Sequence, residues 1–166
     1  MQLIKVFSYI YLLKKEDTYI DFENSIGPWL GRTVKISNYV LNESFKSNKL
    51  DLTKEQMLVL KKLHDKDGLN QNELACQLLR NKSSLTRLLT KMESKNYILR
   101  QQSVKDKRVN NIFLTQAGKD IFLKSKPVIK KMLTEMELSI SKKEKDQLIN
   151  TLKKIQTNLN TKVNSF

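Results

Sequence analysis

Small hydroxyl-bearing and cationic side chains recur at helical spacing in the middle of the chain. Ser83, Arg87 and Lys91 lie four residues apart, and Ser84 and Thr86 lie beside them. In a helix these side chains share one outward strip. Hydroxyls and cations bind phosphate oxygens and base edges, and side chains this small fit a major groove about 12 Å wide. The strip therefore predicts a helix that binds duplex DNA, and a merely solvated helix face is the alternative.

A second group of cations lies at the tip of a predicted hairpin. Residues 98–102 and 109–114 have the composition of two strands, with Ile112 and Leu114 on one face and Phe113 on the other. Cations at a hairpin tip can reach the minor groove or the flanking phosphates. A tip that only improves solubility is the alternative. The cations at this tip are Lys105, Lys107 and Arg108.

The positive charge of the chain is concentrated around these two groups. The 166 residues include 31 Lys and Arg against 17 Asp and Glu, for a net charge of +14. The span 80–110, which begins with Arg80 and Lys82, contains nine of the cations and two acids, so it contributes half of that net charge. A charge of this size favours a polyanionic partner, either nucleic acid or an anionic membrane surface.

Composition excludes most other classes of function. Hydrophobic residues make up 39% of the chain, enough for a folded core. With Cys76 as the single cysteine no internal disulfide can form, which favours a reducing compartment, and we interpret Cys76 as a small half-buried residue rather than a redox sensor. One His and one Cys cannot supply a usual zinc site, and no phosphate-binding loop or catalytic motif is present. We therefore expect no cofactor, no metal and no enzyme activity.

The first residues are apolar but do not resemble a membrane segment. The run Met1–Leu13 is interrupted by Gln2, Lys5 and Ser8 and is shorter than the roughly 20 residues that span a bilayer. It also lacks the basic start and small-residue cleavage site of a signal peptide. Helical spacing and strand alternation compete in this run, and we predict a helix. We treat residues 1–23 as an N-terminal extension, either an extra packing segment or an unstructured start, and expect no membrane partner.

The elements that must position the two groups follow from local signals. Apolar residues at helical intervals predict a helix over 24–46 that begins near Pro28 and has two apolar faces, one of them including Trp29 and Tyr39. Thr53 with Gln56, and Asn70 with Glu73, predict the capped starts of two short helices. Gly68 fits a left-handed turn between these helices. Their predicted inward residues are Met57, Leu60 and Leu63 in the first, and Leu74, Leu78 and Leu79 in the second.

A third helix is predicted over Lys82–Lys95, and Asn96 fits the positive φ that ends a helix. Thr115 can cap a further helix to about Ser139 that includes Pro127, and Ser141 with Glu144 opens the last helix. The inward stripe of the third helix is Leu85, Leu88, Leu89 and Met92. The seam of the last helix, with coiled-coil spacing, is Leu148, Leu152, Ile155 and Leu159.

A helix, a short helix, an amphipathic helix and a hairpin with a basic tip form, in that order, a winged helix-turn-helix. The expected fold class is therefore mainly α, with a small β-hairpin wing and with N- and C-terminal helices available for dimerisation. The sequence from Leu52 to Lys119 resembles the MarR family of bacterial transcriptional regulators. The resemblance rests on the runs LTKEQ, LNQNELA and KSSLTRLLTKMESKNYILR, on the wing signature DKRVNNIFLT from Asp106 to Thr115, and on the QAGK that follows.

The resemblance implies a single domain over 24–160. Within it, 24–46 is a dimer helix, 52–115 the winged helix-turn-helix and 116–160 the C-terminal dimer helices. The family forms obligate homodimers that bind near-palindromic duplexes, so we expect a homodimeric, sequence-specific repressor in the bacterial cytosol, associated with the nucleoid when bound. The expected DNA-binding residues are Arg80, Lys82, Ser83, Ser84, Thr86, Arg87, Lys91, Lys105, Lys107 and Arg108.

The resemblance also implies roles for individual residues. The recognition helix falls on Lys82–Lys95, the wing-tip arginine on Arg108, and the wing aspartate on Asp106, which we expect to orient the wing through an ion pair that includes an arginine of the recognition helix. Asn96 replaces the family's usual Gly, and Asn tolerates the same backbone conformation. Oxidant-sensing members have a cysteine near the N-terminal dimer helix, where this chain has none.

The family often binds small aromatic or amphipathic acids in a cleft, and an effector of this kind would relieve repression. The residues that could line such a cleft are Trp29, Arg32, Tyr39 and His64. Dimer core for Trp29 and Tyr39, and a helix-end cation for His64, are the simpler interpretations. For the whole protein, a non-specific basic DNA-binding protein and a dimeric protein–protein adaptor with the same fold remain the alternatives.

Overall fold

The computed structural model describes residues 20–103 and 106–160, and the chain divides into two compact units, 1–43 and 44–166. The predicted helix at Met1–Leu13 and the predicted DNA-binding residue Lys105 lie outside the described residues. In the described part, no helix has both the length and the apolar character that a membrane crossing requires.

The first unit contains most of α2 (Ile26–Ser47), which starts and ends within two residues of the predicted bounds. A turn around Asp21 precedes the helix. The side chain and backbone N–H of Asn24 both donate to the Asp21 carboxylate, and these hydrogen bonds lower the pKa of Asp21 below its ordinary value. Trp29 Nε1 donates to the carbonyl of Glu23 at 2.7 Å. Pro28 lies in the first turn of the helix, as predicted.

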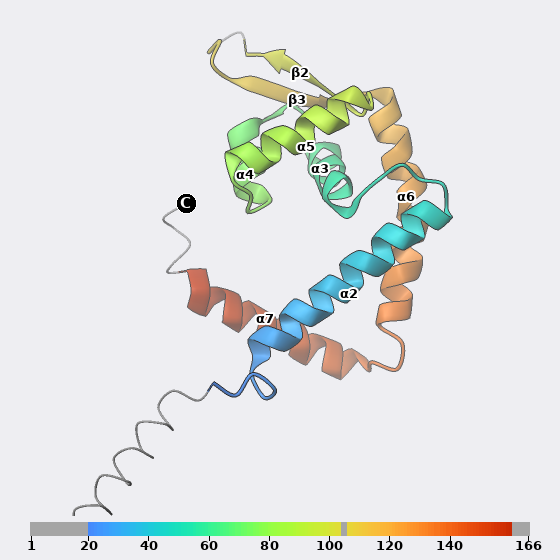
Figure 1. Cartoon of the computed structure of the whole chain (residues 1–166), viewed down its shortest axis with the longest axis vertical. Helices are drawn as coiled ribbons and strands as arrows, with labels where there is room; N and C mark the ends of the chain where they lie inside the picture. Colours follow the sequence, from blue (N-terminus) through green and yellow to red (C-terminus); the bar gives the residue numbers. More distant parts are fainter. Residues whose placement is uncertain (1–19, 104–105, 161–166) are drawn as a thin grey trace, which may run out of the picture. The chain divides into compact units, whose positions relative to one another are not determined.

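The second unit opens its folded core with two capped helices (Figure 1). In α3 (Lys54–Asp65), Thr53 and Gln56 form the predicted capping box, and in α4 (Gln71–Gln77), Asn70 and Glu73 form the other. Gly68 has φ of 73°, and a Cβ at this position would lie 2.8 Å from the Phe113 ring. Both the backbone and the packing therefore require glycine in the turn between these helices.

The sheet has three antiparallel strands in the order β1-β3-β2. The predicted hairpin is present as β2 (Ile98–Gln102) and β3 (Asn110–Leu114). Strand β1 (Leu69–Asn70) was not predicted, because two residues are too few to show a periodicity. Leu69 pairs with Ile112, so β1 covers the edge of β3 that the hairpin leaves open.

Helix α5 (Lys82–Ser94) starts at its N-cap Asn81 and is followed by Asn96 at φ of 55°. The backbone N–H of Tyr97 closes this end by donating to the carbonyl of Met92 at 2.9 Å. The core of the unit lies between α3, α5, α6 and the sheet. Its largest fully buried residues are Phe45, Leu60, Leu63, Leu69, Leu74, Leu85, Leu89, Met92, Ile98 and Ile112.

Two predictions about α4 are wrong. Leu79 does not cover an inward face: it lies beyond the end of α4 at φ of 49°, with its side chain 82% exposed. Ala75 is buried beside Leu74 instead. Cys76, interpreted above as half-buried, is exposed. The helix is seven residues long, so a period extended past Gln77 no longer predicts which side chains face the core.

The last two helices carry the predicted caps. Thr115 caps α6 (Gln116–Met136), which ends three residues before the predicted Ser139, and Ser141 with Glu144 caps α7 (Lys142–Asn160). Hydrogen bonds from Ser141 lower the pKa of Glu144 below its ordinary value. The seam residues Leu148 and Leu159 of α7 are more than half exposed.

Candidate nucleic-acid interface

Helix α5 presents three separate stripes of side chains. Leu85, Leu89 and Met92 are buried in the core, as predicted, while Leu88 is only half-buried. A second stripe, at positions 86, 90 and 93, contacts the side chain of Arg100 from β2. The third stripe borders a hollow of about 370 Å³ on the outer surface, lined by Asn81, Ser83, Ser84, Arg87, Leu88 and Lys91.

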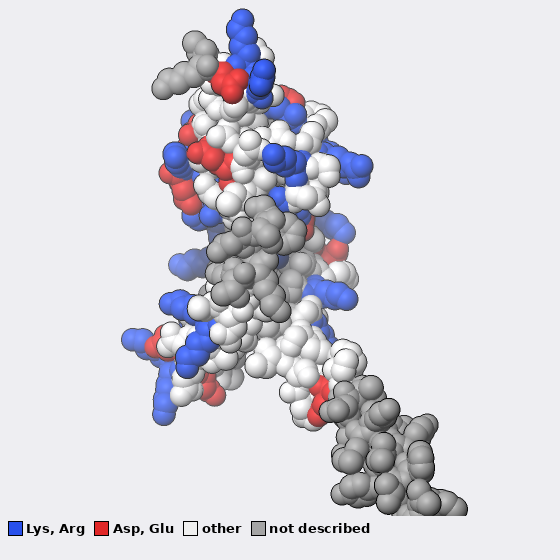
Figure 2. Space-filling model, turned by 90° about the vertical axis from the view of Figure 1, so that its left-hand side faces the viewer, with Lys and Arg blue, Asp and Glu red and all other residues white. Residues whose placement is uncertain are grey.

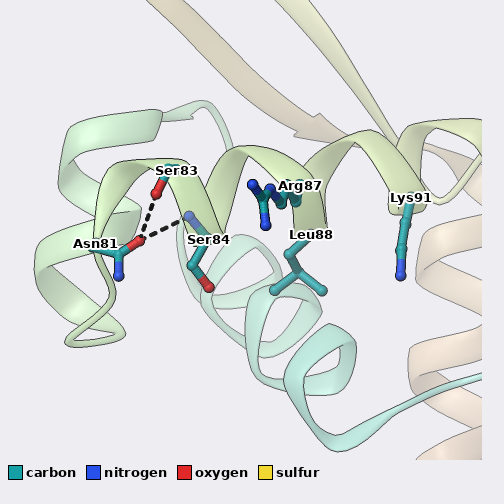
Figure 3. A pocket seen from close by; sticks show the side chains of 6 residues that line it. All are labelled: Asn81, Ser83, Ser84, Arg87, Leu88 and Lys91. Carbon is teal, nitrogen blue, oxygen red and sulfur yellow. Dashed lines mark hydrogen bonds between the residues drawn. The ribbon is translucent and has the colours of Figure 1, made fainter.

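The hollow contains four of the predicted DNA-binding residues. Ser83, Arg87 and Lys91 are exposed, and Ser84 is half-buried. In Figure 3, Ser84 and Lys91 point to the same side of α5, with Leu88 between them. Hydroxyl and cationic groups thus border a shallow surface whose middle is apolar. Such a surface can bind phosphate oxygens at its rim and a base edge or methyl group near its centre.

Asn81 organises the start of this surface. Its Oδ1 accepts hydrogen bonds from the Ser84 backbone N–H at 2.8 Å and from the Ser83 hydroxyl at 3.0 Å (Figure 3). Arg80 Nη1 donates to the Ser84 hydroxyl at 3.2 Å, which ties this predicted DNA-binding residue to the helix start. The side chains are therefore ordered by contacts within the protein, a form of preorganisation that lowers the entropic cost of binding.

Thr86 lies on a different stripe from the other predicted contact residues. Its hydroxyl donates to the carbonyl of Lys82 at 2.8 Å and accepts from the Gln71 side chain of α4. It is not among the residues that line the hollow, so the structure does not bring Thr86 together with Arg87 and Lys91. Lys82 is exposed in the first turn of α5.

The wing tip is held by a turn around Asp106. Its carboxylate accepts the backbone N–H of Arg108 at 2.9 Å, and its carbonyl accepts the backbone N–H of Val109 at 2.9 Å. Lys107 and Arg108 are exposed. Across residues 20–103 and 106–160, Asp106 forms no ion pair, so the predicted pair with a recognition-helix arginine is wrong. A carboxylate that accepts a backbone N–H two residues away stabilises the turn without a cation.

The predicted effector-binding residues fall in both units. Trp29, Arg32 and Tyr39 are exposed residues of α2 in the first unit. His64 belongs to the second unit, where its ring lies 4.9 Å from the ring of Phe122 in α6. A shared pocket for these four residues stays a prediction. Within the described part of the chain, no cluster of His, Cys, Asp or Glu could hold a metal ion.

Sequence reasoning missed three residues of this region. Asn81 and Leu88 line the hollow, and Arg100 contacts α5 from the neighbouring strand. The position of Asn81 just before the helix was an available signal, because Asn is a favoured N-cap. Nothing local predicts the contacts of Arg100.

The face of the molecule drawn in Figure 2 presents more basic than acidic side chains, in line with the net charge of +14.

Comparisons with known proteins agree on one family. The model of the MarR family matches residues 52–109. The HTH-type transcriptional regulator SarZ of Staphylococcus haemolyticus is 32% identical over 112 residues, which cover 66% of this chain and 74% of that protein.

Solved structures share the fold. The reduced form of MarR from E. coli has a TM-score of 0.67 and 26% identity, covering 79% of this chain and 96% of that one. The transcriptional repressor CouR, solved on a 23-mer DNA duplex, has a TM-score of 0.74 and 22% identity over 80% of this chain and 93% of its own. These likenesses confirm a mainly helical, winged helix-turn-helix fold with a small antiparallel sheet. Together with the family match and the similarity to SarZ, they place the chain in the MarR family of DNA-binding transcriptional regulators, which are not enzymes.

Proposed function

We propose that this protein is a sequence-specific repressor that binds a near-palindromic duplex as a homodimer. The observation that carries the proposal is the outer stripe of α5, where Ser83, Arg87 and Lys91 border one hollow on a helix whose opposite side is buried. A helix anchored in this way presents the same side chains at every encounter, which is what base recognition requires.

Each side chain of the stripe has a role that its chemistry suggests. The planar guanidinium of Arg87 can donate two parallel hydrogen bonds to the O6 and N7 acceptors of guanine. Lys91, one turn further along, suits a phosphate, because its ammonium group is a compact point charge. Ser83 and Ser84 at the helix start suit phosphate oxygens. Lys107 and Arg108 of the wing suit the flanking backbone or minor groove.

Dimerisation would place two such helices in successive major grooves about 34 Å apart. Exposed apolar side chains on α2 and α7 support it: Trp29 and Tyr39 are 55% and 69% exposed, and Leu148 and Leu159 are 54% and 55% exposed. Large apolar side chains exposed on a helix in this way are typical of a subunit interface. We assign 24–46 and 116–160 to the dimer interface, within a domain over 24–160. CouR, of similar fold, is a repressor solved on DNA.

Relief of repression would follow from a small aromatic or amphipathic acid that changes the distance between the two recognition helices. Trp29 and Tyr39 would supply aromatic surface for such a ligand, and Arg32 would supply a cation for its carboxylate.

Fluorescence anisotropy tests the proposal. The protein is titrated at about 150 mM salt onto labelled DNA from upstream of its own gene, with random duplex of equal length as competitor. We expect the upstream duplex to stay bound in about a hundredfold excess of competitor. Equal competition by the two duplexes would favour a non-specific DNA-binding protein, a class that the net charge of +14 also suits. No binding to either would favour the adaptor. Sedimentation equilibrium of the free protein tests the dimer.

A further inference from the structure

We infer that Arg100 is a positioning residue that joins the wing to the recognition helix, so that the two elements contact DNA as one body. The inference rests on the proposed function, because it concerns how the wing reaches the duplex. Arg100 lies in the middle of β2, opposite Ile112 of β3, and its side chain reaches across to α5. It is 20% exposed, although it lies in the most basic part of the chain.

The guanidinium of Arg100 contacts three consecutive positions of one helical stripe. Its Nη2 donates to the Thr90 hydroxyl at 2.9 Å and to the Thr86 carbonyl at 3.4 Å. Its Nε lies 3.3 Å from the Glu93 carboxylate. These three positions span two turns of α5, so a single planar group fixes both the distance and the direction of β2 relative to the helix.

The contact between Arg100 and α5 supports the strand of the wing that β1 does not reach. Strand β1 pairs with β3 only at Ile112 and Asn111, so it supports one strand of the hairpin and none of its tip. A two-stranded hairpin without other support is marginally stable and free to twist. Arg100 holds the other strand, β2, in the same row as Ile112. The hairpin is therefore fixed on both edges in that row, and the direction of its tip follows from these two attachments.

Arg100 is distinct from the residues proposed to contact DNA. The stripe that it contacts is not the one that lines the hollow, since positions 86, 90 and 93 are absent from that lining. Its charge is neutralised by Glu93 rather than left for a phosphate. Its effect on DNA binding would therefore act through the wing cations, above all Arg108.

A double-mutant cycle tests this coupling. Arg108→Ala is made in the wild-type protein and in Arg100→Met, which keeps an apolar stem but removes the guanidinium. Affinity is measured by anisotropy for the upstream duplex and for a random duplex. We expect Arg108→Ala to weaken binding about tenfold in the wild-type background and about twofold or less when Arg100 is absent. The reason is that Arg108 at a displaced tip already contacts DNA poorly, so its removal costs little affinity.

Three further variants separate positioning from other roles. Arg87→Ala is made in the wild-type and the Arg100→Met backgrounds. It should weaken DNA binding by the same factor in each, because α5 remains anchored in the core. Thr90→Val keeps the shape of the side chain but removes the hydroxyl, which accepts from Arg100 at 2.9 Å and donates to the Thr86 carbonyl of its own helix at 3.0 Å. This variant should fold normally and should reduce in part the loss of affinity that Arg108→Ala causes. Thr90→Val therefore tests the coupling even if Arg100→Met fails to fold. Arg100→Lys keeps the charge without the planar guanidinium group, so it should restore the coupling only partly.

The outcomes are distinguishable. Equal costs of Arg108→Ala in all backgrounds would overturn the inference and leave the proposed function intact. A salt dependence that falls by about one unit of slope in Arg100→Met would overturn it as well, because it would make Arg100 a phosphate contact. If Arg108→Ala costs nothing in the wild-type protein, the wing has no role in binding, and that part of the proposed function fails together with the inference.

Discussion

Gly118 of α6 lies so close to the backbone of Tyr97 that a Cβ added to it would stand 2.0 Å from the Tyr97 carbonyl oxygen. The same oxygen accepts the backbone N–H of Thr115, the N-cap of α6, at 3.2 Å. The start of α6 is thus packed directly against the backbone that leads into the wing. No side chain can fit between them, and both contacting atoms belong to main chain that cannot rotate away.

We predict that Gly118→Ala lowers the free energy of unfolding by about 3 kcal/mol, because the added methyl group forces α6 and the start of β2 apart. Urea unfolding followed by circular dichroism measures the change. The neighbouring Lys119→Ala is the control, since Lys119 is exposed and its replacement should change stability by less than about 0.5 kcal/mol. Equal stability of Gly118→Ala and the wild-type protein would contradict this packing.

Leu79→Gly should stabilise the protein by about 1 kcal/mol. Leu79 occupies the left-handed position after α4, where a Cβ is unfavourable, and its side chain is 82% exposed, so little burial compensates for the strain. The thermal midpoint of unfolding should therefore rise. Asn96→Gly is the matched control: Asn96 has a similar φ of 55°, but Asn tolerates this conformation, so its gain should be smaller. A lower midpoint for Leu79→Gly would show that the leucine makes a stabilising contact.

Arg87→Ala should weaken binding to the operator by roughly 1–3 kcal/mol and should weaken binding to random duplex less, so the preference for the operator falls. The physical reason is that a bidentate contact to a base edge discriminates between sequences, whereas a phosphate contact does not. Competition anisotropy with both duplexes measures the difference. Lys66→Ala, which removes an exposed cation outside the proposed interface, should leave the preference unchanged. An equal loss on both duplexes would make Arg87 a phosphate contact.

Stability should fall as the pH rises above about 10, in part because of Tyr97. Burial raises the pKa of the Tyr97 phenol above its ordinary value of 10.0, and the nearby Asp51 carboxylate raises it further. The phenol thus has its ordinary pKa in the unfolded chain and a higher pKa in the folded protein. As the pH rises, the unfolded chain loses this proton first, so deprotonation favours unfolding. Unfolding free energies at pH 8 and 11 should therefore differ less for Tyr97→Phe than for the wild-type protein.

Tyr97→Phe should also be less stable than the wild-type protein near neutral pH, which provides an internal check. The Tyr97 hydroxyl donates to the carbonyl of Asp51 at 2.9 Å, so the free energy of unfolding of Tyr97→Phe should be about 1 kcal/mol lower at pH 8. All other side chains are the same in both proteins, so the comparison isolates the contribution of Tyr97. An identical alkaline loss in both proteins would exclude Tyr97 as a contributor.

Local signals were sufficient for most of the fold. The capping boxes at Thr53 and Asn70 and the positive φ of Asn96 were predicted from residues a few positions apart, and the structure confirms them. Each depends on side chain to backbone contacts within one turn, which the sequence contains in full. The order of the elements then restricted the fold to a winged helix-turn-helix, and the family motifs agreed.

Tertiary structure alone decided how the stripes of α5 are used. Thr86 looked equivalent to Arg87 in sequence, but its hydroxyl bonds with Gln71 in α4, fifteen residues away, and its carbonyl accepts from Arg100, fourteen residues away. The strand β1 exists because Leu69 meets Ile112, and nothing in the two residues of β1 predicts that pairing. A sequence determines the periodicity and the ends of its helices through neighbouring residues. Which face of a helix meets a second element depends on contacts between distant residues, and these form only when the whole domain folds.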